Sequence, residues 1–146
     1  MNGPAHKGRC LCGRISFEAD TKPLWVDYCH CNSCRRSTGA PVTTFVAFHR
    51  DSVRVTGEPK AYSSSPGVYR SFCGHCGTPL SYESDDCPGE IHFYISVMDA
   101  PDIYLPQRHV FHEEHISWLE LNDDLPRYEG LARNEPASWG PKHQQK

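Results

Sequence analysis

The sequence predicts a small, mainly β protein with little helix, in which short strands are joined by tight turns. The chain has 12 Pro and 11 Gly in 146 residues, which argues against long helices and favours turns between short strands. Hydrophobic residues make up 38% of the chain, so these strands can bury only a lean core. This length fits one domain, and we expect that domain to need a stabilising interaction in addition to apolar burial.

Period-two alternation, or a run of β-branched and aromatic residues, predicts each strand in turn. In the first half of the chain such segments cover residues 13–19, 24–28, 42–49 and 53–56. In the second half they form two hairpins, at residues 61–65 with 68–73 and at 79–83 with 90–98. Residues 99–106 are expected to be a loop, whereas 109–121 fits either a short helix or an extended stretch.

Composition divides the chain into an N-terminal segment at 1–6, a domain at 7–132 and a loosely ordered polar tail at 133–146. The opening MNGPAHKGRC has no apolar run, and no stretch approaches the roughly 18 apolar residues of a membrane span. We therefore expect a cytoplasmic protein with no membrane contact. Lys and Arg total 15 against 18 Asp and Glu, with no basic block, so nucleic-acid binding is not expected.

The eight cysteines could supply this additional stabilising interaction. In a reducing compartment, clustered cysteines favour metal ligation over a disulfide framework. Seven of them fall into three groups: Cys10-x-Cys12, Cys29-x-Cys31-x-x-Cys34 and Cys73-x-x-Cys76. The eighth, Cys87, lies in an Asp-Asp-Cys-Pro loop, where we expect a thiol rather than a ligand.

The Cys73-x-x-Cys76 pair has a glycine after each cysteine, which is typical of a zinc knuckle. Glycine permits the tight turn in which backbone N–H groups approach the sulfurs. A thioredoxin-like redox pair is the alternative. That motif normally opens a helix, however, and residues 79–82 resemble a strand.

Ligand counting then suggests one closed and one open zinc site, because structural zinc takes four ligands. The knuckle and the Cys10-x-Cys12 pair together complete a four-cysteine site. The remaining group offers three sulfurs within six residues, and three protein ligands with an open position describe a catalytic zinc. Two alternatives stay open: a histidine such as His30 or His75 fills that position, or the knuckle pairs with the three-cysteine group.

Arg35 and Arg36 follow the three-cysteine group directly. Zinc with three thiolates carries a formal charge of −1, so nearby cations would stabilise it. The same guanidinium groups could bind a substrate carboxylate. A solvated pair on a turn is an equally good interpretation of these two residues.

Several motifs resemble the glutathione-dependent formaldehyde-activating enzyme family, which includes centromere protein V-like, β-tent zinc proteins. The matching runs lie at residues 8–18, 29–41, 72–80, 97–99 and 117–119, so the resemblance extends over about residues 8–128. It implies a β-tent fold of small antiparallel sheets around a four-cysteine zinc site. It also implies two zinc ions per chain, one structural (Cys10, Cys12, Cys73, Cys76) and one catalytic (Cys29, Cys31, Cys34).

The activity that this resemblance implies joins glutathione to formaldehyde to give S-hydroxymethylglutathione, which is a carbon–sulfur lyase reaction run backwards. The expected partners are then a small thiol such as glutathione and an aldehyde. Two other functions remain open, a non-catalytic zinc module for protein interaction and a role in thiol or redox handling. The sequence does not predict the oligomeric state.

Overall fold

The structure is a computed structural model that describes residues 6–131, and it confirms the prediction of a mainly β protein with little helix. The strands are β1 His6–Arg9, β2 Ser16–Ala19, β3 Trp25–Cys29, β4 Thr43–His49, β5 Val53–Thr56, β6 Lys60–Ser65, β7 Val68–Phe72, β8 Pro79–Ser84, β9 Glu90–Tyr94 and β10 Arg108–Val110. The helices are α1 Asn32–Thr38 and the 3-10 turns η1 Arg50–Ser52, η2 Ile95–Val97, η3 Pro101–Ile103 and η4 His112–Glu114. Most of the predicted N-terminal segment and the whole tail from residue 133 lie outside the described residues.

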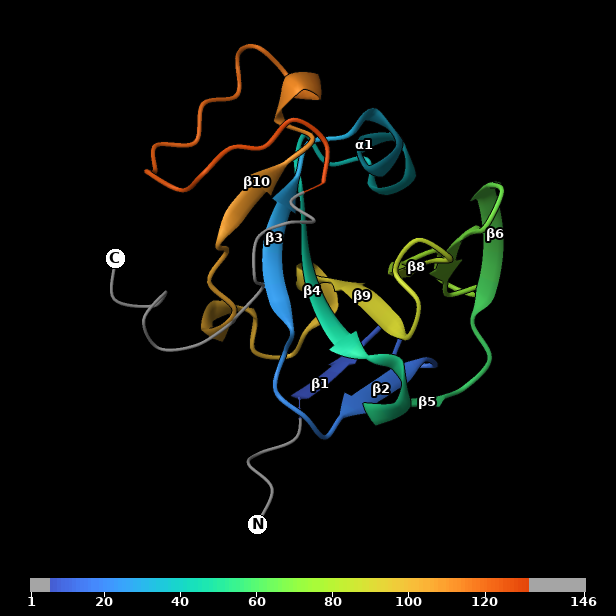
Figure 1. Ribbon diagram of the computed structural model, residues 1–146. Coiled ribbons are helices and arrows are strands. Elements are labelled where there is room, and N and C mark those ends of the chain that lie inside the picture. Colours follow the sequence, from blue (N-terminus) through green and yellow to red (C-terminus); the bar gives the residue numbers. More distant parts are fainter. Residues whose placement is uncertain (1–5, 132–146) are drawn as a thin grey trace.

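The strands form two sheets, one of three strands in the order β1-β2-β5 and one of seven in the order β10-β3-β4-β9-β8-β7-β6. The pairings are antiparallel except that β10 runs parallel to β3, which the sequence did not predict. Figure 1 shows β10, β3 and β4 side by side, with α1 over one end and β1, β2 and β5 beneath the other.

The core lies between the two sheets, because alternate residues of the central strands face the small sheet. Val26, Val46 and Phe93 occupy one row across β3, β4 and β9. All three are buried, and the Phe93 ring stacks on Phe17 of β2 with centroids 3.7 Å apart. A single ring stack thus joins the two sheets at the centre of the core.

The opposite face of the same strands carries polar, aromatic and sulfur-bearing side chains. Cross-strand pairing aligns Trp25 with Ala47 and Ala47 with His92, and the next row aligns Asp27 with Phe45. The small Ala47 side chain leaves room above it, so the Trp25 and His92 rings meet with centroids 4.5 Å apart. Because side chains alternate along each strand, the polar and sulfur-bearing residues face away from the apolar core.

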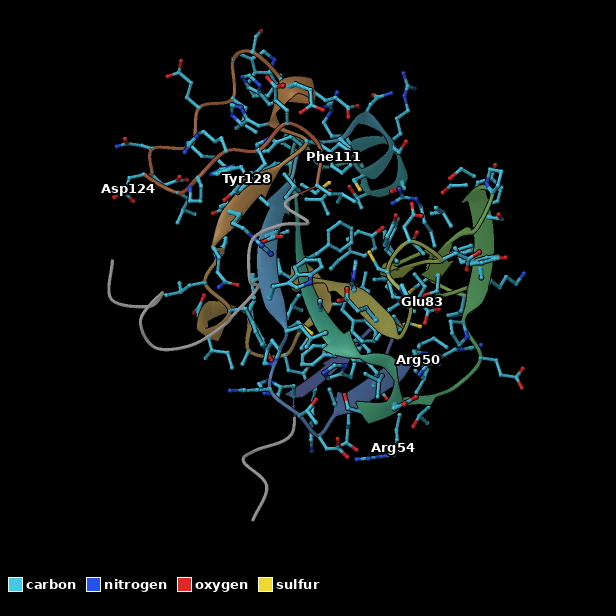
Figure 2. The ribbon with its side chains drawn as sticks, in the orientation of Figure 1. Arg50, Arg54, Glu83, Phe111, Asp124 and Tyr128 are labelled. Atoms are coloured by element: carbon cyan, nitrogen blue, oxygen red, sulfur yellow. The ribbon has the colours of Figure 1, made fainter. Side chains whose placement is uncertain are left out.

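Within the seven-stranded sheet, β8 and β9 share the fewest residue pairs. These pairs are Ser81 with Phe93 and Tyr82 with His92. Beyond this joint, β8, β7 and β6 turn away from the central strands (Figure 1). An ion pair holds the outer arm to the end of β4, with Arg50 Nε 3.0 Å from Glu83 Oε1. Figure 2 shows these two side chains near one another beside β8.

Strand β1 and helix α1 were missed in the sequence, as were the short 3-10 turns η1, η2 and η3. Strand β1 is polar and short, and it pairs with β2 where Gly8 lies against Phe17. Helix α1 has seven residues, and its ends are set by the Cys31 sulfur, which accepts from the Cys34 N–H, and by Gly39 at φ 73°. Cysteine is not among the usual N-cap residues, so this helix start gave no recognisable signal. The ambiguous segment at residues 109–121 contains most of β10 and all of η4.

We expect Gly8→Ala to lower the free energy of unfolding by about 2 kcal/mol, the range found for overpacking a well-filled core. A methyl group at this position would collide with the Phe17 ring and with the Val97 carbonyl oxygen. Urea denaturation measures the loss. The neighbouring Lys7→Ala is the control, because Lys7 is exposed and makes only a surface ion pair with Glu18. Equal stability of the two variants would contradict this packing.

Candidate metal centres and the adjoining cavity

Four cysteines from distant parts of the chain meet in one cluster, which we call the four-sulfur group: Cys10, Cys12, Cys73 and Cys76. Their sulfurs all lie within 4.8 Å of one another, with 3.6 Å between Cys10 and Cys12 and 3.8 Å between Cys12 and Cys73. A tetrahedral zinc with Zn–S bonds of about 2.3 Å would set its sulfurs about 3.8 Å apart. These separations fit that ion and are far too long for disulfides.

Backbone N–H groups point at the sulfurs of this group, as the knuckle interpretation predicts. The N–H of Ile15 donates to Cys10 Sγ at 3.3 Å, and the N–H groups of His75 and Cys76 donate to Cys73 Sγ at 3.4 and 3.5 Å. Such donors stabilise thiolates. The tight turn itself is closed by Gly77, which adopts φ 80° and donates to the Cys73 carbonyl at 2.8 Å.

Thr78 joins the two halves of the four-sulfur group and was not recognised in the sequence. Its hydroxyl accepts from the Leu11 N–H at 3.0 Å and lies 3.1 Å from Cys76 Sγ. The hydroxyl beside the sulfur lowers the pKa of the Cys76 thiol to about 5. A threonine next to a knuckle carries no signal of its own, because its partner Leu11 is distant in sequence.

The second cluster, the three-sulfur group, consists of Cys29, Cys31 and Cys34, again within 4.8 Å of one another. Cys29 ends β3, Cys31 caps α1, and Cys34 lies in the first turn of that helix. Cys29 and Cys34 are buried, and their thiols beside Cys31 lower the pKa of Cys31 to about 2. The neighbouring sulfurs and burial raise the pKa of Cys29, so without a metal the negative charge of the group lies on Cys31, next to two neutral thiols.

The three-sulfur group has no fourth protein ligand within the same 4.8 Å limit, counting the Cys, His, Asp and Glu side chains of residues 6–131. His30, which the sequence left as a candidate, points its Nε2 at His109 Nδ1, 2.8 Å away. His75 is exposed in the knuckle of the other group. Within this limit the described residues therefore supply three ligands to the group.

Arg70 of β7 is the cation that touches the three-sulfur group, and sequence reasoning missed it. Its Nη1 lies 3.6 Å from Cys34 Sγ and also donates to Ser37 Oγ at 3.2 Å and to Tyr94 Oη at 3.3 Å. Burial works against the charge of Arg70, but the neighbouring Cys34 sulfur raises its pKa above the ordinary value. The guanidinium therefore stays protonated beside the sulfurs. The signal was absent because Arg70 is 36 residues from Cys34.

Arg35 and Arg36, the arginines expected beside a substrate carboxylate, lie elsewhere. The Arg35 guanidinium donates to the backbone carbonyls of His30 and Glu114, which fixes the loop after β3 against η4. Arg36 is exposed on α1. Neither lines the cavity described below, and the carboxylate contact stays a prediction.

A chain of hydrogen bonds that runs from the exposed Asp123 to the buried His109 and His30 supports the loop that holds Cys29 and Cys31. Asp123 accepts from His109 Nε2 at 3.0 Å, which leaves His109 Nδ1 to accept from His30 Nε2. The remaining His30 Nδ1 is buried without a partner among the described residues. Burial, with smaller contributions from neighbouring histidines, lowers the pKa of His30 to about 4, so the ring is neutral and this chain of bonds fixes its tautomer.

A cavity of about 700 Å³ opens beside the three-sulfur group. Its floor is the chemistry-bearing face of β3, β4 and β9, and its walls come from α1, β7, β8 and the segment after β10. Phe111, which adopts φ 52°, lines one side and lies next to α1 in Figure 2. The lining includes all three sulfurs of this group and none of the four-sulfur group. Drug-sized ligands occupy cavities of this volume.

Asp27 and Arg108 form a bidentate ion pair in the floor of this cavity, with both N–O distances at 2.9 Å. Burial raises the pKa of Asp27, and the Arg108 charge opposes that rise. Because Arg108 is fully engaged by this carboxylate, Arg70 is the cavity cation that contacts sulfur.

Comparison with known proteins places the chain in a family. The family of glutathione-dependent formaldehyde-activating enzymes matches residues 5–114, and the chain belongs to this family. A protein of Schizosaccharomyces pombe, described as an uncharacterized lyase, is 33% identical over 79 residues. That match covers 54% of this chain and 58% of the relative's length.

Among solved structures, a Rhodobacter sphaeroides protein superimposes with a TM-score of 0.53 at 19% identity. The match covers 84% of this chain and 99% of that one, and it shows a shared fold. The name β-tent stays a prediction. Among the described residues, no helix has both the length and the apolar character needed to cross a bilayer.

We expect Asp123→Ala to lower the free energy of unfolding by about 1–3 kcal/mol at pH 7, because it leaves the buried His109 Nε2 without an acceptor. Although burial opposes it, the His109 hydrogen bond lowers the pKa of Asp123. The stabilisation is therefore present above the carboxyl's unfolded pKa, about 3.9, and is lost as the pH falls through the lower folded value. Urea denaturation at pH 7 and pH 3 measures both effects.

The neighbouring Asp124→Ala serves as the matched control. Asp124 is exposed, and Figure 2 shows its side chain at the outer edge of the molecule. A loss as large for Asp124→Ala as for Asp123→Ala would contradict a supporting role for the hydrogen-bond chain.

Proposed function

We propose that this chain is a zinc-dependent carbon–sulfur lyase that acts on a thiol–aldehyde adduct such as S-hydroxymethylglutathione. One observation carries the proposal: three sulfurs without a fourth protein ligand line a cavity of about 700 Å³, while the four-sulfur group lies outside it. Family membership and the lyase name of the yeast relative support the same class of reaction.

The two sulfur groups would divide the metal-binding roles between them. Cys10, Cys12, Cys73 and Cys76 would hold a structural zinc that ties the loop after β1 to the β7–β8 turn. Cys29, Cys31 and Cys34 would hold a second zinc at the cavity. A zinc ion bound at this second position would lower the pKa of a coordinating thiol and polarise an aldehyde oxygen.

In the direction of synthesis, the glutathione thiol loses its proton and a sulfur–carbon bond forms at formaldehyde, whose oxygen then takes up a proton. In the lyase direction the hydroxyl of the adduct loses its proton, the same bond breaks to release formaldehyde, and the sulfur takes up a proton. The guanidinium of Arg70 offsets negative charge on the sulfurs of the site. Burial raises the pKa of Tyr94, so its hydroxyl stays protonated next to Arg70.

Cobalt substitution tests this proposal. We expect glutathione to change the thiolate charge-transfer bands of cobalt bound by the three-sulfur group and not those of cobalt bound by the four-sulfur group, because of these two groups only the first lacks a fourth protein ligand. The zinc form should accelerate formaldehyde release from S-hydroxymethylglutathione over the uncatalysed rate. Cys31→Ser should abolish both effects and keep the fold, whereas Cys73→Ser should unfold the domain because metal binding there is folding energy.

Two results would count against the lyase. Glutathione-insensitive bands together with no rate acceleration would favour a non-catalytic zinc module. Equal loss of circular dichroism in Cys31→Ser and Cys73→Ser would contradict the division between a structural and a reactive site.

We expect Arg70→Gln to weaken metal binding by the three-sulfur group about tenfold or more, since a hydrogen bond to a charged group contributes about 1.5–3 kcal/mol. Glutamine places its amide near the position of the Arg70 Nε, which contacts Ser64, while removing the charge. Chelator competition followed by metal analysis measures the affinity. The exposed Arg36→Gln is the control, and a larger loss there than at Arg70 would restore Arg36 as the cation of the site.

A further inference from the structure

A third cluster of metal-ligating side chains lies in the same cavity, apart from both sulfur groups. It consists of Cys87, Glu90 and His92, which we call the mixed group. One ligand atom from each lies within 4.8 Å of the other two, and all three residues line the cavity. The group was not recognised in the sequence, where Cys87 was expected to be a thiol outside the metal sites.

The β8–β9 turn brings these residues together. The Cys87 N–H donates to the Ser84 carbonyl at 3.0 Å, and the Glu90 N–H donates to the Cys87 carbonyl at 3.2 Å. Glu90 and His92 are two residues apart on β9, so their side chains leave the strand on the same face. The Arg50 N–H donates to the Gly89 carbonyl at 2.8 Å and anchors the turn to the end of β4.

The imidazole of His92 is held in a fixed position. Its Nε2 lies 2.8 Å from Glu90 Oε2. Trp25 meets the ring edge-on with centroids 4.5 Å apart, and Tyr82 stacks on it at 5.5 Å. The side chain of His92 is 7% exposed and that of Glu90 is 28% exposed, so the carboxylate faces the cavity while the ring is buried. Ligands held in this way lose little freedom when an ion binds.

We propose that Cys87, Glu90 and His92 form a further metal site that binds a divalent transition ion such as Zn²⁺ or Co²⁺. Thiolate, imidazole and carboxylate are the three ligand types that zinc takes in proteins, and three ligands at a cavity wall leave a position for a small molecule. Asp86 also lines this cavity and adds negative charge, whereas the charge of Asp27 is offset by Arg108. With a single sulfur, the site binds its ion more weakly than the two all-sulfur groups.

The mixed group is a separate site and not half of a two-metal centre. His92 pairs with Ala47 and Cys29 pairs with Thr43, so the two rows are four residues apart along β4. At about 3.4 Å per residue this places them about 14 Å apart along the strand. Two-metal centres hold their ions about 3.5–4 Å apart. An elongated ligand in the cavity would meet one ion near each end.

Metal stoichiometry tests the inference. The full chain and its variants are equilibrated at a buffered micromolar concentration of free Zn²⁺, and bound metal per chain is counted by mass spectrometry. We expect Cys87→Ser and His92→Gln each to bind one equivalent less than the unmodified chain. Co²⁺ in place of Zn²⁺ should give a thiolate charge-transfer band that both variants lose.

His49→Gln is the matched control and should keep the full metal content. His49 is exposed at the end of β4 and pairs with Glu90 across the ladder, but it is not part of the mixed group. Glu90→Gln preserves the shape of the side chain and should reduce affinity at least tenfold even if His92→Gln folds poorly. Equal metal content in the unmodified chain, Cys87→Ser and Glu90→Gln would overturn the site. Because the assay counts metal, its result is independent of lyase activity.

Discussion

The two-residue period of β3, β4 and β9 is the constraint on which the rest of the structure depends. Every second side chain must enter the apolar layer against β1, β2 and β5, which fixes Val26, Val46 and Phe93 as core. The intervening positions then face the other way as a set, whether or not they are apolar. Cys29, Asp27 and His92 share a cavity because of this alternation, and a one-residue slip of register would exchange core and site.

This alternation explains which elements could be predicted from the sequence. Strand β5 was predicted at its observed bounds, and β4 and β8 to within one residue, because alternation and β-branched content are local signals. The structure brings the cysteines together in the two groups that ligand counting suggested, because the spacing within each motif is a local signal. Helix α1 was not predicted because a cysteine sulfur takes the place of the usual N-cap oxygen. The parallel pairing of β10 with β3 was not predicted, because strands far apart in the sequence are not joined by a turn that could be recognised.

The residues around the site were harder to predict than its ligands. Arg70 belongs to a hairpin whose sequence shows no relation to α1, and only the bend of the sheet brings it to Cys34. Arg35 and Arg36 were proposed because they are adjacent in sequence, but Arg35 is used to hold backbone carbonyls. His109 and Asp123 support His30 from positions 79 and 93 residues away. The cation beside the sulfurs, the tautomer of His30 and the walls of the cavity all depend on tertiary contacts, so the spacing of residues in the sequence does not predict them.

The narrow joint between β8 and β9 has a mechanical consequence. Two residue pairs give the arm of β6, β7 and β8 few backbone hydrogen bonds to the rest of its sheet, so side-chain contacts form a larger share of its attachment. Two of these side chains are Arg50, through Glu83, and Arg70, through Cys34. A change in the charge of the sulfurs would therefore act on Arg70, and through it on a strand that forms one wall of the cavity.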